Sequence, residues 1–163
     1  MDQPKFPSAK VAAAVGMSHD NFRAHLSRKG WRIIDKSPAE AGKAQTFSMK
    51  DVLGYALARV LTSYGVDTVT AFDRAMQDFA HVGDERRNPA GVNDVVKHGH
   101  AYYAFTLGMP RGEILSEKEL STRIPDLFGR MTMAGAEGVI LIDLTILRDR
   151  VFQALGLDAR DYE

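Results

Sequence analysis

Apolar residues recur at helical spacing in two short segments close to the start of the chain, residues 8–15 and residues 19–29. Between them stands Gly16-Met17-Ser18, whose glycine is a typical helix end and whose serine is a typical N-cap. In the second segment Phe22 and Leu26 lie one turn apart, so they mark the face that packs inward. Two short helices joined by such a turn predict a helix-turn-helix.

A β-hairpin is predicted directly after these helices. Residues 31–34, with the sequence Trp-Arg-Ile-Ile, are typical of a short strand, and Thr46-Phe47 is the expected partner. The polar residues 36–45 between them contain a proline and a glycine, as a loop does. A strand, a loop and a returning strand would form a wing beside the two helices.

The next apolar pattern predicts a helix over about residues 49–63. Its apolar positions cover most of its circumference, so we expect it to be buried in the middle of the domain. Ser48 and Asp51 have the spacing of a capping box at its start. A second helix is expected over about residues 68–81, with Asp67 as its N-cap.

Four apolar residues of this second helix recur at spacings of three, four and three. Such a seam is typical of a surface that a partner helix covers. We therefore predict that it contributes to a homodimer contact, with the strands near the C-terminus as the alternative. The seam consists of Val69, Phe72, Met76 and Phe79.

The pattern fades over residues 83–99, which we interpret as a linker, and it returns as a mixed α/β pattern over residues 100–163. A shift in composition at the linker supports a domain boundary there. The sequence therefore predicts an α+β protein. A winged helix-turn-helix domain would cover residues 1–82, and a small α/β dimerisation or sensing domain would follow the linker.

Three strands and two helices are expected in the C-terminal part. The strands cover residues 101–107, Ile114-Leu115 and residues 138–144, the last of which is one continuous apolar run and so should be buried. A short helix is expected after Ser116 and should end before Pro125. The final helix is expected over residues 145–155, with Ile146, Leu147, Val151 and Leu155 facing inward.

Composition narrows the classes of function. The chain has 163 residues and no cysteine, which excludes disulfides and cysteine-ligated zinc and fits a reducing cytoplasm. It has no run of about 18 apolar residues, so no membrane-spanning helix is expected.

The net charge is zero, but residues 1–50 contain nine Lys/Arg and four Asp/Glu, a balance of +5, and residues 51–163 contain twelve Lys/Arg and seventeen Asp/Glu, a balance of −5. A basic N-terminal part predicts an anionic partner, with nucleic acid as the first candidate.

The N-terminal half, about residues 6–80, resembles the MerR-type winged helix-turn-helix, a pattern that excisionase-like DNA-binding proteins share. The resemblance rests on the turn, on a residue pair within the second helix and the glycine that follows this helix, and on the starts of the two helices that come next. It implies binding to double-stranded DNA through the second helix and the wing. The long C-terminal dimerisation helix of that family has no counterpart in the pattern. The matching residues are Gly16-Met17-Ser18, Phe22-Arg23, Gly30-Trp31, Phe47-Ser48-Met49-Lys50-Asp51 and Gly65-Val66.

In a helix-turn-helix the second helix enters the major groove with the side chains that face away from its core. There arginine can bind guanine or phosphate, and asparagine can bind adenine. Backbone amides near Ser18 favour phosphate, and wing lysines would meet phosphate at the edge of the site. Asp20 would contact cytosine or orient Arg23, or is simply favoured by the helix dipole. The predicted DNA-binding residues are Ser18, Asp20, Asn21, Arg23, Ser27, Arg28, Lys29, Lys36 and Lys43.

Other chemistry is only weakly indicated. His98 and His100 flank Gly99, but a metal site needs three or four ligands and no further one is obvious nearby, so neither a metal nor another cofactor is predicted. Asp143 stands at the end of an apolar strand, where we expect it to cap the next helix. No Ser-His-Asp spacing, phosphate-binding loop or dinucleotide motif is present, so no enzyme activity is predicted.

These observations favour a cytoplasmic, sequence-specific DNA-binding protein that regulates transcription as a homodimer. Two alternatives stay open. One is a phage or mobile-element accessory protein, excisionase-like or involved in packaging, that uses the same residues to organise DNA. The other is a protein-binding module in which the helix-turn-helix is only a scaffold. The sequence also leaves open whether a small-molecule effector binds.

Overall fold

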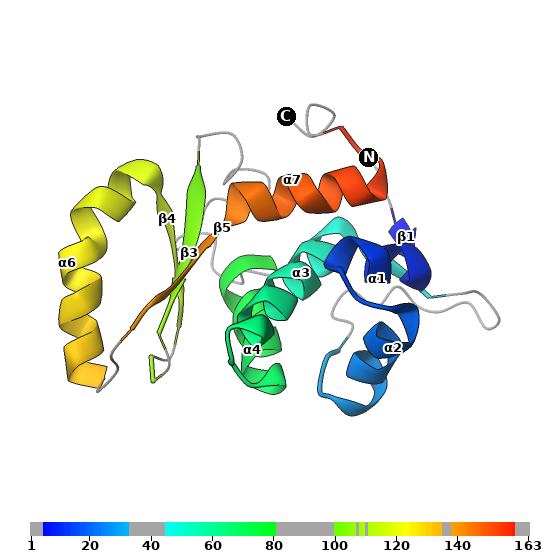
Figure 1. Cartoon of the computed structure of the whole chain (residues 1–163), viewed down its shortest axis with the longest axis horizontal. Coiled ribbons are helices and arrows are strands. Elements are labelled where there is room, and N and C mark those ends of the chain that lie inside the picture. Colours follow the sequence, from blue (N-terminus) through cyan, green and yellow to red (C-terminus); the bar gives the residue numbers. More distant parts are fainter. Residues whose placement is uncertain are drawn as a thin grey trace.

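The computed structural model describes residues 5–32, 45–80, 100–106, 108–109, 111–134 and 138–158 (Figure 1). Within these residues the protein is α+β, as predicted, with a helical body beside a three-stranded sheet. The predicted linker, residues 83–99, lies outside the described residues.

The helical body combines the N-terminal part of the chain with one helix from the C-terminal part. Its elements are α1 (Ser8–Val15), α2 (His19–Arg28), α3 (Met49–Ser63), α4 (Thr68–Ala75), the π-helical turn η1 (Met76–Ala80) and α7 (Leu144–Leu155). α7 returns from the sheet and packs against α1 and α3 (Figure 1). Buried residues from both parts of the chain therefore form one continuous hydrophobic core.

The sheet is antiparallel, with β3 in the centre and β4 and β5 at its edges. Helix α6 lies over β4 and β3 on one face, and the helical body covers the other (Figure 1). Side chains alternate between the two faces. Tyr103 of β3 is fully buried toward the helical body, and it lies opposite Ile142 of β5. The bounds are β3 Ala101–Phe105, β4 Glu113–Ser116, β5 Ile140–Asp143 and α6 Glu117–Ala134.

The centre of the helical body is an aromatic cluster of five side chains, none more than 1% exposed. Tyr55 of α3 lies in the middle of the cluster. Its ring stacks on Trp31 at 5.4 Å and on Phe72 at 6.1 Å, measured between ring centroids, and Phe22 meets it edge-on at 5.3 Å. Burial raises the pKa of Tyr55 far above its usual value, so the hydroxyl stays protonated. The aromatic cluster consists of Phe22, Trp31, Phe47, Tyr55 and Phe72.

The predicted capping residues are confirmed at the starts of three helices. At α3, Ser48 Oγ accepts a hydrogen bond from the Asp51 amide and the Asp51 carboxylate accepts one from the Ser48 amide, each at 3.2 Å. Asp67 caps α4, and Asp143 caps α7 by accepting from the Ile146 amide at 2.9 Å. Each cap satisfies an amide that would otherwise lack a partner, and a cap of this kind contributes about 1 kcal/mol.

The predicted partner of Thr46-Phe47 differs from the one that the structure describes. These residues belong to β2, Thr46–Ser48, which pairs antiparallel with β1, Lys5–Pro7, and places Phe47 opposite Phe6. Both phenylalanines are buried, so pairing them removes two aromatic rings from water. Trp31 and Arg32 lie in no strand, and residues 33–44 are outside the described part, so the wing stays a prediction.

The prediction that α6 ends before Pro125 is wrong. The helix runs from Glu117 to Ala134 and contains this proline in its interior. Proline removes one backbone donor, which leaves the carbonyl of Ser121 without its usual partner. Both residues are exposed in this part of the helix, so water can bind that carbonyl and the loss is tolerated.

The apolar run over residues 138–144 does not form a fully buried strand, which corrects a second prediction. Among the described strands β5 lies at the edge of the sheet, and Leu141 is 44% exposed. Ile146 was predicted to face inward but is 64% exposed. The helix begins at Leu144, and its buried side follows Leu144, Leu147, Val151 and Leu155.

A buried carboxylate connects the helical body to the sheet. Asp78 of η1 has a side chain that is 2% exposed, and its Oδ2 accepts hydrogen bonds from the Tyr103 hydroxyl and the Gly112 amide, both at 2.9 Å. The Arg111 guanidinium lies 3.9 Å from Oδ1. Burial raises the pKa of Asp78. The hydrogen bonds from Gly112 and Tyr103 and the charges of Arg74 and Arg111 lower it by a smaller amount, so the net shift is upward.

This raised pKa predicts a measurable pH dependence for Asp78→Asn. The native state binds the Asp78 proton more tightly than the unfolded chain does. The protonated carboxyl therefore contributes its full share to the free energy of unfolding below the unfolded pKa of 3.8, and this contribution is lost as pH rises through the higher pKa of the folded state. An asparagine oxygen can accept both hydrogen bonds without the charge. We expect the free energy of unfolding of Asp78→Asn, relative to the natural chain, to increase as pH rises from 4 to 7.

Urea denaturation at several pH values measures this difference, and Tyr103→Phe is the matched control. The control removes one donor to Asp78 and keeps the charge, so it should lower stability by about 1–3 kcal/mol without removing the pH dependence. Parallel stability curves for Asp78→Asn and the natural chain would show that Asp78 ionises normally in the fold.

Candidate nucleic-acid interface

The helix α2 has one buried side and one solvent-facing side. Phe22 and His25 are buried, and Leu26 is half-buried against the same core. Phe22 lies in the aromatic cluster, and the His25 ring lies 4.6 Å from Trp31. The inward direction predicted for Phe22 is confirmed. The helix is therefore held to the body along one side.

Both ends of α2 are fixed by hydrogen bonds. Ser18 caps the start by accepting from the Asn21 amide at 3.2 Å. Ser8 at the start of α1 lies 2.9 Å from His19 Nε2, which ties the beginnings of the two helices together. At the other end the His25 carbonyl accepts from the Trp31 amide at 3.1 Å. These contacts determine where the exposed side of α2 points.

The predicted contact residues that lie within α2 form one continuous exposed surface. At 100° per residue, the positions from Arg23 through Asp20 and Arg28 to Asn21 span about 160° of the helix circumference, opposite Phe22, His25 and Leu26. No residue of this surface is buried. Its helical members are Asp20, Asn21, Arg23, Ser27 and Arg28, and the predicted residues Ser18 and Lys29 are exposed at the two caps that flank it. Lys36 and Lys43 lie outside the described residues.

The cations of this surface are not neutralised within the described part of the chain. Arg23, Arg28 and Lys29 are exposed, and none of them forms an ion pair or a side-chain hydrogen bond there. Asp20 is exposed on the same side and is also unpaired in these residues. Because their charge is not offset by an acidic neighbour in contact, the three cations are available to an anionic ligand.

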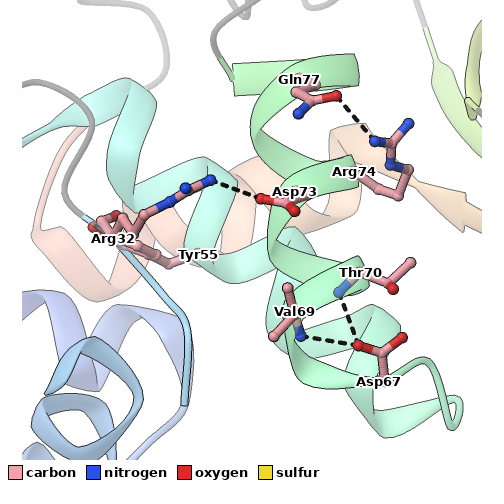
Figure 2. Close-up of polar contacts among 8 residues, drawn as sticks. All are labelled: Arg32, Tyr55, Asp67, Val69, Thr70, Asp73, Arg74 and Gln77. Carbon is pink, nitrogen blue, oxygen red and sulfur yellow. Dashed lines mark hydrogen bonds and ion pairs between the residues drawn. The ribbon is translucent and has the colours of Figure 1, made fainter. Parts of the chain in front are cut away.

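The segment that follows α2, residues 29–32, is the exit from this helix. It is held in place by α4, an arrangement that the sequence pattern did not reveal. Figure 2 shows Arg32 reaching across to Asp73, and the two side chains form an ion pair at 2.9 Å. The Tyr55 hydroxyl donates to the Arg32 backbone carbonyl at 2.9 Å. Arg32 and Asp73 are 41 residues apart, so no local spacing could have connected them. They position the segment that follows α2.

The start of α4 packs against the same exit. Gly30 has a φ of +87°, and a Cβ added there would lie 2.8 Å from Val69 Cγ2. Asp67 fixes this end of α4 by accepting from the Val69 and Thr70 amides at 3.2 Å and 3.0 Å (Figure 2). The hydrogen bonds from Thr70 and Val69 lower the pKa of Asp67, so the cap stays ionised.

The seam predicted for a homodimer is used inside the chain instead. Phe72, Met76 and Phe79 are at most 3% exposed and belong to the core that α4 and η1 share with α3. Val69 alone of the four is exposed, at 51%. The predicted seam is therefore wrong as a dimer contact, because an intrachain helix produces the same spacing of apolar residues as a partner helix does.

Other candidate chemistry is sparse in the described residues. His100 Nδ1 lies 3.5 Å from Asp143 Oδ2, but no group of three or more potential metal ligands is found among the residues that the structure describes. His98 lies outside them. No helix in the described part is long and apolar enough to cross a membrane.

The contact between α4 and the exit of α2 predicts a coupled pair of substitutions. Gly30→Ala should lower the free energy of unfolding by about 1–2 kcal/mol, because an alanine is strained at this φ. Its Cβ would also meet Val69, so Val69→Ala should recover at least about 0.5 kcal/mol in the double variant. Urea denaturation of the four proteins measures this coupling.

Gly16→Ala is the matched control for this experiment. Gly16 has a φ of +79°, and a Cβ there would meet nothing within 4 Å. The same backbone strain is expected, without any coupling to Val69. Additive effects of Gly30→Ala and Val69→Ala would contradict a packed contact between α4 and the exit of α2.

No protein-family model matches the sequence, and no curated protein matches it significantly. The case for a function therefore rests on the geometry of α2 and its surroundings.

Proposed function

We propose that the chain binds double-stranded DNA through the exposed side of α2 and acts as a transcriptional regulator in the form of a homodimer. The observation that carries the proposal is a set of three cations that are unpaired in the described residues, Arg23 and Arg28 on the exposed side of α2 and Lys29 at its C-cap, while the other side of α2 is anchored in the core. A rigid helix with free cations suits a ligand with closely spaced negative charges, and the DNA backbone is such a ligand.

The dimensions and side chains of α2 suit the major groove. Its ten residues span about 15 Å, which is short enough to lie across the groove with its first turns near the bases. Asn21 and Arg23 are in those turns and can form paired hydrogen bonds with adenine and guanine. Ser18 accepts from the Asn21 amide only, so the His19 and Asp20 amides of the first turn could donate to a phosphate oxygen, which the helix dipole would favour.

The charge distribution supports the same partner. The balance of +5 over residues 1–50 belongs to the part of the chain that contains α2, and the balance of −5 over residues 51–163 belongs to the remainder. Such an asymmetry would orient the molecule with its basic end toward DNA. A DNA-binding regulator of this kind would act in the cytoplasm and would need no catalytic step.

Selection from a pool of random-sequence 30-base-pair duplexes tests the proposal. The protein is immobilised, the pool is applied at low salt, and the retained duplexes are sequenced after a wash at moderate salt. An enriched palindromic sequence is expected for a dimeric reader of DNA. Retention of all sequences alike, lost as salt rises, would favour the accessory role in organising DNA. No retention at low salt would overturn DNA binding and favour the protein-binding module.

Single substitutions on α2 should weaken binding in two different ways. Arg23→Ala should raise the Kd for the selected duplex by about 5- to 150-fold, which corresponds to about 1–3 kcal/mol, and should relax the sequence preference at one position. Lys29→Ala should weaken binding to all sequences alike and reduce the slope of log Kd against log salt by about one unit. Fluorescence anisotropy with labelled duplexes measures both effects.

Arg150→Ala is the matched control for these variants. Arg150 of α7 is exposed and, like Arg23, makes no ion pair in the described residues, but it lies on a different element. Its substitution should leave the Kd within about twofold. Equal losses for Arg150→Ala and Arg23→Ala would show that net charge, and not the surface of α2, determines binding.

A further inference from the structure

The edge strand β5 presents an apolar surface that no described element covers. In the part of the chain that the structure describes, β5 pairs with β3 on one side and with no strand on the other. Its sequence, Ile-Leu-Ile-Asp, contains no lysine or proline, the residues that commonly protect a strand edge. Leu141 is 44% exposed on the face where α6 lies over β4 and β3.

We infer that β5 pairs antiparallel with the β5 strand of a second copy of this chain, which joins two three-stranded sheets into one sheet of six strands. The inference deepens the homodimer in the proposed function, since it names the surface that forms the dimer. A strand edge offers a row of backbone donors and acceptors, and another strand satisfies them in full. Two copies related by a twofold axis use the same surface on each partner.

The alternation of side chains limits how the two strands can align. Residues directly opposite each other in an antiparallel pair point to the same face of the sheet. In β5, Ile142 points toward the helical body with Tyr103, so Leu141 points to the face with α6. A twofold axis perpendicular to the sheet preserves the faces. It must therefore pass midway between one residue of β5 and the same residue of the second copy, so that these two stand directly opposite each other.

Of the alignments that remain, we favour the one in which Leu141 faces its own copy across the twofold axis, because it pairs the apolar side chains of the two strands with one another. It places Leu141 opposite Leu141 of the second copy on one face and Ile140 opposite Ile142 on the other, and it moves Asp143 to the end of the pair, opposite Val139. The alignment centred on Ile142 would place Leu141 opposite Asp143, a carboxylate that caps α7 and lies 3.5 Å from His100. A charge buried against leucine next to the twofold axis is unfavourable. The Leu141-centred alignment keeps Asp143 farther from the axis, opposite Val139 at the end of the paired strands.

The mass of the protein in solution, measured without DNA, is the first test. At 100 μM, light scattering after gel filtration should give twice the 18.0 kDa of the chain. Leu141→Lys should give the single-chain mass, because two lysines would stand opposite each other at the twofold axis. Tyr64→Lys is the control, since Tyr64 is 65% exposed at the end of α3 and should not affect the dimer. A single-chain mass for the natural protein, or a dimer that survives Leu141→Lys, would overturn the inference.

A crosslinking experiment tests the alignment itself. Because the chain has no cysteine, only the introduced cysteine can form a disulfide. Opposite Cα atoms in the dimer would be about 4.5–5.5 Å apart, within the range that a disulfide spans. Leu141→Cys should therefore form a covalent dimer on mild oxidation. Val139→Cys is the control, because residues 139 of the two copies would be about 13 Å apart along the strands.

The two Cys variants also separate this inference from the proposed function. Efficient crosslinking of Val139→Cys, or none of Leu141→Cys, would overturn the Leu141-centred pair. Neither the mass nor the crosslink involves DNA, so a protein that dimerises through β5 but retains no duplex would contradict only DNA binding. A protein that binds duplexes as a single chain would contradict only the dimer.

Discussion

The stacking of Tyr55 on Trp31 is the contact on which the helical body depends. Tyr55 comes from the buried helix α3, whereas Trp31 follows α2, and their rings are nearly parallel, 5.4 Å apart. Around this pair Phe22, Phe47 and Phe72 supply three further rings, each from a different element. The cluster therefore determines at once the position of α2, the position of β2 and the closeness of α4 to α3. Aromatic packing of this kind combines a large buried area with preferred ring angles, so it orients the elements as well as holding them together.

The connection between the helical body and the sheet is chemically different. Apart from apolar packing, it uses the buried carboxylate of Asp78, which is reached by the Tyr103 hydroxyl and the Gly112 amide. Asp78 belongs to a π-helical turn, an irregular element that often occurs where a helix meets a special local demand. Here the turn brings a carboxylate to the sheet while Met76 and Phe79 of the same turn stay in the core. The aromatic cluster thus orients α2, and Asp78 secures the sheet that carries the candidate dimer edge.

Local sequence was enough to predict the caps of α3, α4 and α7, but not the end of α6 or the long-range pairings. Ser48 with Asp51, and Asp67 and Asp143 as caps, are short-range motifs with one physical role, and each is found as predicted. The partner of β2 and the Arg32–Asp73 ion pair depend on residues far apart in the chain. The seam in α4 failed for a related reason, because an apolar stripe says that something covers it without saying what. In the candidate interface, the exposed side of α2 follows directly from its inward-facing Phe22, whereas the lack of ion pairs at its cations needed the structure.

The position of Trp31 also provides an optical probe. It is the single tryptophan of the chain, it is fully buried, and its ring lies against Tyr55 and 4.6 Å from His25 of α2. The emission of this indole therefore reports on the junction between α2 and the helical body, with no contribution from a second tryptophan near the sheet. Local opening of that junction would expose the indole to water and shift its emission to longer wavelength, even while the sheet and α6 stay folded. The natural protein thus carries its own fluorescent label at the base of the helix proposed to meet DNA.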